Sequence, residues 1–202
     1  NLAAVFSTEA YNAICEFLGA NWYALAGTLI LAAGVVVHLV YATVLTLHNR
    51  SSRGSQRYAM TAEPEGVTWA SRNMYVLGII IVLGLLLHLY NFWYNMQFAE
   101  IIGNHELGPF PPADGAAYIA ALFSSPVYCI IYLVWFAAIW FHLTHGFWSA
   151  FHTIGWDNQT WLPRLKRIAN VVATIVFLCF ALVVIVFYLR SLGVCGGSCA
   201  GF

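Results

Sequence analysis

The chain has 202 residues, of which 61% are hydrophobic and only 8% are charged, against roughly a quarter charged in soluble domains. This composition predicts a membrane protein embedded in a lipid bilayer, and the net charge of zero gives no support to a nucleic-acid partner. The five cysteines form no CxxC or CxxCH pattern, which excludes the usual motifs for iron–sulfur clusters, zinc and covalent c-type haem.

The hydrophobic runs predict an all-α membrane protein, a single transmembrane helix bundle over residues 1–202. Residues 1–21 are mildly amphipathic and predict a short interfacial helix capped by Ser7. Asp114 is expected to cap a second short helix that runs through Leu122. Each predicted span has the roughly twenty apolar residues that crossing a bilayer requires. The spans are predicted at about 22–47, 73–96, 125–151 and 168–189.

Positive charge gathers in two connections on one side of the predicted bundle, residues 48–72 and 152–167. They hold seven of the eight Lys and Arg, whereas the other side holds Arg190 and five of the eight acidic residues. By the positive-inside rule the two connections are cytoplasmic, so both ends of the chain and the 97–123 loop face outward. Near the C-terminus, Cys195 and Cys199 either form a small disulfide or remain free thiols, and both possibilities stay open.

Four histidines lie within the predicted spans, where an ionisable side chain is costly and therefore indicates function. At about 1.5 Å per residue, His38 lies roughly 24 Å below the outer start of its span, in the cytoplasmic half. His145 lies about 20 residues below the start of its own span and reaches the same half, with His142 one turn above it. His88 lies about 22 Å from the cytoplasmic start of its span and is therefore in the outer half.

Two histidines at one depth on different helices match the ligation of a haem, whose iron binds imidazoles on opposite faces of the ring. Gly34 and Gly84 each precede an intramembrane histidine, His38 and His88, by four residues. They therefore lie on the same helix face as the histidine and would leave room for a porphyrin. The alternative is that both glycines are ordinary small-residue packing positions between helices.

Two assignments stay open on the residues alone. His142 could replace His145 as the iron ligand, although we expect it to bond a backbone carbonyl or a haem propionate. His88 has no second intramembrane histidine at its depth, so it is either structural or paired with a histidine on a helix before Asn1. Such a helix would also account for a chain that starts outside the membrane without an initiator methionine.

Four stretches are spread over most of the chain: EAYNAICEFLGAN, VVVHLVYATVLTLHNR, LLLHLYNFW and HLTHGFWSAFHTIGW. They resemble the dihaem cytochrome b (b558-type) anchor subunit of succinate dehydrogenase and fumarate reductase (succinate:quinone oxidoreductase, complex II). The resemblance implies a multi-pass protein of the bacterial inner membrane with five spans, of which this sequence holds the last four. It implies that His38 and His145 ligate a proximal haem b near the cytoplasmic side. It also implies that His88 ligates a distal haem b with a partner on the missing first helix.

The resemblance implies a role in the respiratory chain and the tricarboxylic acid cycle. A flavoprotein subunit with FAD interconverts succinate and fumarate, and an iron–sulfur subunit passes electrons to the anchor. The anchor exchanges them with a membrane quinone, expected to be menaquinone, through its two b haems. Some menaquinol-oxidising members carry a glutamate two residues before the fourth-helix ligand, where this chain has Leu143. Proton return across the membrane by that route is therefore unsupported.

A quinone site needs an apolar slot with a hydrogen-bond donor, and the sequence leaves two sides open. The outer candidates are Glu9, Glu16, Trp93 and Tyr94, with His105 and Glu106, and the inner candidates are Ser71, Trp148 and His152. The expected cytoplasmic dock for the iron–sulfur subunit comprises Arg50, Arg53, Arg57, Trp69, Arg72, His152 and Trp156. Two rival functions remain. One is a cytochrome b anchor of another oxidoreductase, such as a hydrogenase or formate dehydrogenase. The other is a small transporter that uses intramembrane histidines as proton relays.

Overall fold

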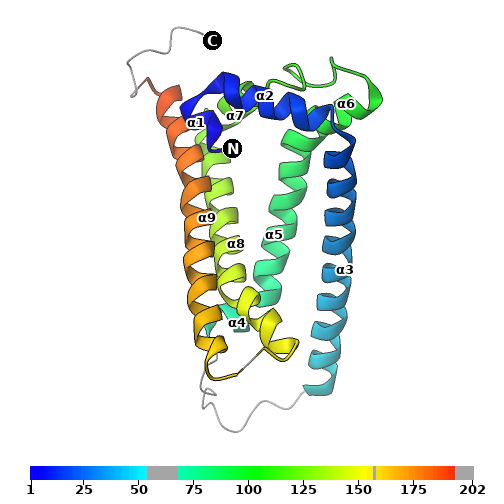
Figure 1. The fold of residues 1–202 in the computed structure, drawn as a ribbon, viewed down its shortest axis with the longest axis vertical. Helices are drawn as coiled ribbons and strands as arrows, with labels where there is room; N and C mark the ends of the chain where they lie inside the picture. Colours follow the sequence, from blue (N-terminus) through cyan, green and yellow to red (C-terminus); the bar gives the residue numbers. More distant parts are fainter. Residues whose placement is uncertain (54–67, 157, 194–202) are drawn as a thin grey trace.

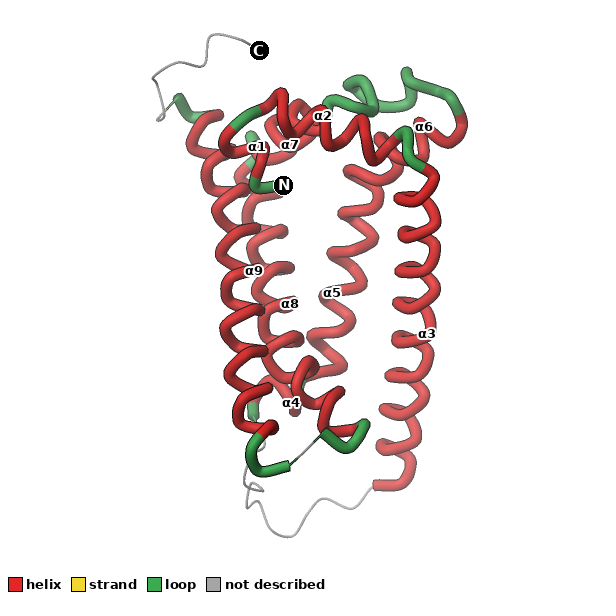
Figure 2. The backbone as a smooth tube through the Cα atoms, viewed as in Figure 1, coloured by secondary structure: helices red, strands yellow, loops and turns green. Residues whose placement is uncertain are grey.

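The structure is a computed structural model that describes residues 1–53, 68–156 and 158–193. Four long helices run roughly side by side (Figure 1), namely α3 (Trp22–Arg53), α5 (Met74–His88), α8 (Pro126–Thr153) and α9 (Trp161–Ser191). Every regular element in these described ranges is a helix, as Figure 2 shows, which confirms the predicted all-α class. Cys195 and Cys199 lie outside the described residues.

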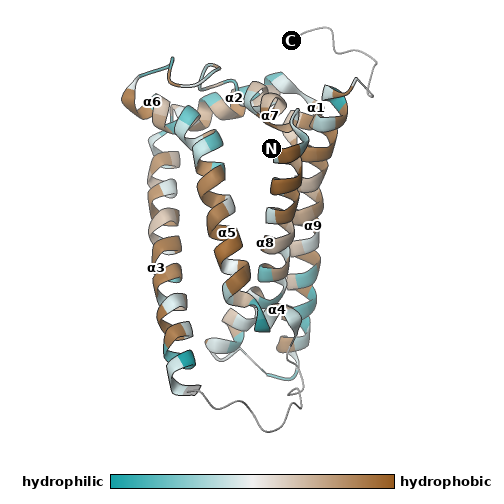
Figure 3. Ribbon diagram, turned by 180° about the vertical axis from the view of Figure 1, so that it is seen from behind, coloured by the Kyte–Doolittle hydropathy of each residue, from teal (hydrophilic) through white to brown (hydrophobic). Residues whose placement is uncertain are grey.

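Within the described ranges, four helical stretches are long and apolar enough to cross a membrane, so the chain is a multi-pass membrane protein. Apolar residues dominate their middle sections and polar residues gather at the ends (Figure 3). The helices are longer than the predicted spans: α3 continues to Arg53, and α9 begins at Trp161 rather than near residue 168. Hydropathy marks only the part of a helix that needs an apolar solvent, whereas backbone hydrogen bonding continues past the membrane surface.

Short helices close one end of the bundle, which we call the capped end. They are α1 (Ala3–Phe6), α2 (Thr8–Gly19), α6 (Ala99–Ile102) and α7 (Gly115–Phe123). The Ser7 side chain accepts a hydrogen bond from the Ala10 N–H (3.1 Å), and Asp114 accepts one from the Ala117 N–H (3.1 Å). Both predicted caps are thereby confirmed. The opposite end carries α4 (Trp69–Arg72), and we call it the α4 end (Figure 1).

A polar bridge fastens α2 to α7 at the capped end. The side-chain amide of Asn12 makes both bonds: its Nδ2 donates to Asp114 Oδ1 (2.7 Å), and its Oδ1 accepts from the Ala116 N–H (3.0 Å). At the same end, the Arg190 guanidinium of α9 donates to the Val5 carbonyl (2.7 Å). The amphipathic N-terminal segment therefore lies across the bundle as part of the fold.

Replacing Asn12 with alanine is expected to lower the free energy of unfolding by about 1–3 kcal/mol, because one of its two partners is a carboxylate and the site is half-buried. Thermal unfolding in detergent measures the change. Thr153→Ala is the matched control, since the Thr153 hydroxyl donates to the Ser149 carbonyl within its own helix (2.9 Å). Equal effects of the two substitutions would show that the bridge contributes nothing specific.

The tightest packing lies between α8 and α9, with α7 added at the capped end. Tyr132 of α8 is 2% exposed and Val184 of α9 is 1% exposed, and Phe123 of α7 packs into the same cluster. Trp140 of α8 donates through Nε1 to the Thr174 hydroxyl of α9 (3.0 Å), which fixes the register of the two helices. By contrast, no described side chain of α3 is buried.

The helix of α5 widens immediately after His88 into the π-helix η1 (Leu89–Phe98). The Asn95 amide donates to the carbonyls of Tyr90 and Asn91 (both 3.1 Å), and the Asn91 amide donates to the Tyr132 hydroxyl (3.2 Å). Segments of π-helix occur frequently at functional sites. The hydropathy pattern that predicted this span contains no signal for the change of helix type.

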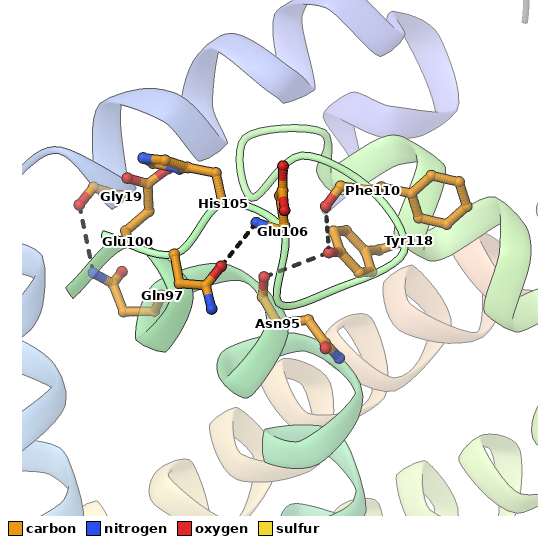
Figure 4. Close-up of polar contacts among 9 residues, drawn as sticks. Gly19, Asn95, Gln97, Glu100, His105, Glu106, Phe110 and Tyr118 are labelled. Carbon is orange, nitrogen blue, oxygen red and sulfur yellow. Dashed lines mark hydrogen bonds and ion pairs between the residues drawn. The ribbon is translucent and has the colours of Figure 1, made fainter. Parts of the chain in front are cut away.

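The loop between α6 and α7 is tied to its surroundings at the capped end (Figure 4). The Tyr118 hydroxyl donates to the Phe110 carbonyl (2.7 Å), and His105 Nδ1 lies 3.7 Å from a carboxylate oxygen of Glu100. Burial raises the pKa of the Tyr118 hydroxyl, so it remains a donor at neutral pH. The Tyr118 hydroxyl of α7 also lies 3.4 Å from the Asn95 carbonyl, which joins η1 to α7.

Candidate functional site

Two histidines from different long helices face each other near the α4 end. The rings of His38 on α3 and His142 on α8 have centroids 6.2 Å apart and planes 80° apart. Imidazole nitrogens bind a first-row metal at about 2.0–2.1 Å, so two rings on opposite sides of one ion have centres about 6 Å apart. The donor set and its spacing therefore fit a bis-histidine haem iron.

The predicted partner of His38 was His145, one turn along α8. The structure instead brings His142 to the His38 ring, while the His145 ring contacts Trp148 with centroids 4.9 Å apart. An estimate of depth cannot decide which of two histidines one turn apart points toward His38, because depth does not give the direction of a side chain around the helix axis. His142 is therefore the histidine of α8 whose ring lies against that of His38.

Buried ring nitrogens without partners support a ligand at these histidines. The Nδ1 atoms of His88, His142 and His145 are buried, and within the described residues none of them has a hydrogen-bond partner. Leaving a buried donor or acceptor unsatisfied costs about 1–3 kcal/mol. These three ring nitrogens therefore keep a hydrogen-bonding or ligating capacity that no described residue uses.

The surroundings of His38 also indicate that its ring needs a partner. Its side chain is exposed on a helix that has no buried side chain among those described, although it lies within a membrane-crossing stretch. A polar ring at that depth requires a partner, because lipid tails offer none. An added Cβ at Gly34, four residues earlier, would meet nothing within 4 Å. There is open space beside this part of α3.

His88 lies at a separate place, between α5 and the α8–α9 pair. Its ring centroid is 5.1 Å from that of Phe92, 6.2 Å from that of Tyr132 and 5.5 Å from that of Trp135. It lines an apolar cavity of about 210 Å³, which extends along α8 and α9. Among the described residues, no second histidine is in ring contact with His88.

Gly84 serves a close approach of two helices. A Cβ at this position would overlap the Trp135 indole of α8, whose Nε1 donates to the Ile81 carbonyl of α5 (3.0 Å). The two glycines predicted to make room for porphyrin therefore differ in this structure. Gly34 borders open space, and Gly84 seats an indole that borders the His88 ring.

Four of the quinone candidates occupy two separate elements at the capped end. Glu9 and Glu16 are exposed on α2 and line a shallow surface depression beside Pro111. Trp93 and Tyr94 follow one another on η1. Tyr94 stacks against neighbouring aromatic rings, and the Trp93 Nε1 atom is buried without a hydrogen-bond partner in the described part of the chain. Of the four, Trp93 alone offers an unused buried donor.

The predicted docking residues that the structure describes belong to the α4 end: Arg50, Trp69, Arg72, His152 and Trp156. The Arg53 side chain and Arg57 lie outside the described residues. One further cation reaches into this end, since Lys166 of α9 lies over the Trp148 ring of α8. In the sequence, Lys166 counted only among the positive charges that predict the orientation in the membrane. Its contact with Trp148 could not be predicted, because a single sequence gives no signal for a contact between two helices.

Comparisons with known proteins find no match for this chain: no family model, no curated protein and no solved structure resembles it closely enough to be counted. The arguments for function therefore come from the residues and their geometry.

Proposed function

We propose that the chain is the haem-binding membrane anchor subunit of a succinate:quinone oxidoreductase, in which His38 and His142 hold one b haem. The observation that carries the proposal is the facing pair of imidazoles, with ring centres 6.2 Å apart, from two helices that cross the membrane. A transporter with histidines as proton relays needs hydrogen-bonded chains, whereas His142 has a buried ring nitrogen with no partner in the described residues.

In this proposal His142 takes the place that the sequence prediction gave to His145. The haem would supply a one-electron redox centre, and His38 of α3 and His142 of α8 would hold it. Gly34 borders the open space beside His38 and leaves room for the ring. Some menaquinol-oxidising proteins of the family have a proton-carrying glutamate two residues before this ligand. With His142 as the ligand, that position is Trp140, which donates a hydrogen bond to Thr174, and with His145 it is Leu143. Neither side chain can carry a proton.

His88 is proposed to be an axial ligand of a second b haem. Its ring borders the apolar cavity beside α8 and α9, whose lining offers an apolar setting for one edge of such a haem. The positive-inside rule makes the α4 end cytoplasmic in this proposal. Electrons would enter there from the iron–sulfur subunit and reach a quinone, proposed to be menaquinone, near Trp93 at the capped end.

Isolation of the tagged full-length chain from its native membrane tests the proposed partners. We expect it to co-purify with a subunit that carries covalently bound FAD and with an iron–sulfur subunit, and to show succinate-dependent reduction of a menaquinone analogue. A nickel-containing or molybdenum-containing subunit in its place would assign the anchor to a hydrogenase or formate dehydrogenase and contradict the proposal.

Filling the space beside His38 is expected to exclude the haem without unfolding the bundle. In Gly34→Phe, the ring would occupy the open space next to the ligand, and the b-type absorption should fall by about half with little change in thermal stability. The control is Gly27→Phe on the same helix, where an added Cβ also meets nothing within 4 Å. Haem content retained in Gly34→Phe would argue against a porphyrin on this face.

A further inference from the structure

We propose that the start of α9 binds the headgroup of an anionic phospholipid through Arg164 and Arg167. The inference goes beyond the proposed function, because it depends on no haem and concerns the outward face of the bundle. Both side chains are exposed and lie three residues apart near the beginning of the helix. Residues at this spacing are neighbours on one helix face, and two guanidinium groups can together donate hydrogen bonds to the oxygens of one phosphate.

The face of α9 that carries these arginines points away from the other helices. The packed face is marked by buried side chains that recur at helical spacing: Leu165, Ala169, Ala173, Ala181, Val184 and Phe187. With about 3.6 residues in each turn, the direction midway between Arg164 and Arg167 lies roughly opposite to the centre of that packed face. The two arginines are therefore directed toward the surroundings of the bundle and not toward α8.

The same outward face continues from the arginines toward the capped end as an apolar strip. Its members follow Arg167 at intervals of three or four residues, and all are exposed: Val171, Ile175, Leu178, Leu182 and Ile185. They lie on a helix that is long and apolar enough to cross a membrane, so acyl chains can cover them. A phospholipid requires this combination, since its phosphate lies at the membrane surface directly above its own acyl chains.

The charges of the described residues favour an anionic partner at this end of α9. All described carboxylates belong to the capped end, namely Glu9, Glu16, Glu100, Glu106 and Asp114. Neither arginine therefore has an acidic partner within the described ranges. The Arg164 guanidinium carbon lies 5.5 Å from the centroid of the Trp161 ring, and that ring is itself exposed. An indole beside a cation is typical of the membrane interface, and it leaves the positive charge unneutralised.

Lys166 carries the same charge on the same turn of α9 but takes a different direction. Its Nζ atom lies 4.3 Å from the centroid of the Trp148 ring of α8, so the ammonium is directed into the bundle. The difference between Lys166 and the two arginines is thus one of direction. The residues expected to dock an iron–sulfur subunit belong to α3, α4 and the end of α8 with the segment after it, so the outward face of α9 is separate from that dock.

Native mass spectrometry of the full-length protein in detergent tests the site, with phosphatidylglycerol and phosphatidylcholine of the same acyl chains as probes. We expect the wild type to bind phosphatidylglycerol more tightly than phosphatidylcholine. Arg164→Gln and Arg167→Gln should each weaken phosphatidylglycerol binding about fivefold, the effect of one basic side chain at an anionic surface, and leave phosphatidylcholine binding unchanged. Lys166→Gln is the matched control and should retain the wild-type preference.

The double variant Arg164→Lys with Arg167→Lys keeps both charges and should retain most of the preference. Equal binding of the two lipids by the wild type, or an equal loss in Lys166→Gln, would overturn the inference. So would displacement of phosphatidylglycerol by glycerol 3-phosphate at the same concentration, because the site would then bind a soluble phosphate. Loss of a co-purifying iron–sulfur subunit from the glutamine variants, with the lipid preference unchanged, would make this face a protein dock instead. None of these results bears on the haem proposed between α3 and α8.

Discussion

Replacing His142 with alanine should remove one b haem from the protein and leave the other in place. The same loss is expected for His38→Ala, because an iron between the two imidazoles needs both of them. The second haem should survive, since His88 lies against η1 and α8 residues that these substitutions do not touch. Haem-to-protein ratios and reduced-minus-oxidised spectra of purified variants measure the outcome.

His145→Ala is the matched control, one turn away on the same helix. We expect it to keep both haems, with at most a small shift in the spectrum. Loss of a haem from His145→Ala and its retention in His142→Ala would restore the ligand predicted from sequence and contradict the assignment drawn from the contact with His38. The pair of variants thus decides between two neighbouring histidines.

The second large effect is expected at Gly84, where the backbone of α5 lies against the Trp135 indole of α8. Gly84→Ala places a methyl group into the Trp135 indole, so the indole must move and its bond to the Ile81 carbonyl weakens. Overpacking of this kind costs about 1–3 kcal/mol, and displacement of Trp135 should also disturb the haem proposed at His88. Thermal unfolding in detergent and haem content report the two effects separately.

Gly78→Ala provides the comparison, because an added Cβ at Gly78 meets nothing within 4 Å. Alanine is the better helix former, so this variant is expected to be as stable as the wild type or slightly more stable. If both variants behave alike, the close contact between Gly84 and Trp135 is not what holds α5 against α8.

The helical architecture could be predicted from the sequence, because hydropathy and helix caps depend on residues that are close together in the chain. Twenty-residue apolar runs can only be helices in a bilayer, and Ser7 and Asp114 each satisfy an N–H group three residues ahead. The helix ends were less predictable, since Arg164 and Lys166 continue α9 beyond the apolar run. The π-helix over Leu89–Phe98 could not be predicted, because hydropathy does not distinguish a π-helix from an α-helix.

The candidate site was only partly readable. Depth placed His38 and His145 in one half of the bilayer, but rotation about the helix axis brings His142 to His38 instead. The equal spacing of Gly34 and Gly84 from their histidines suggested equal roles, yet the space beside them depends on neighbouring helices. Lys166 could not be assigned from sequence, because its contact with Trp148 joins two helices.

The measurement that tests the central claim most directly is an absorption spectrum of the purified full-length protein before and after reduction with dithionite. We predict a b-type α band in the reduced-minus-oxidised spectrum, and its partial loss in His38→Ala and His142→Ala. A protein that folds and purifies intact but shows no b-type band, or a band unaffected by both substitutions, would contradict the proposal that these facing imidazoles hold a haem.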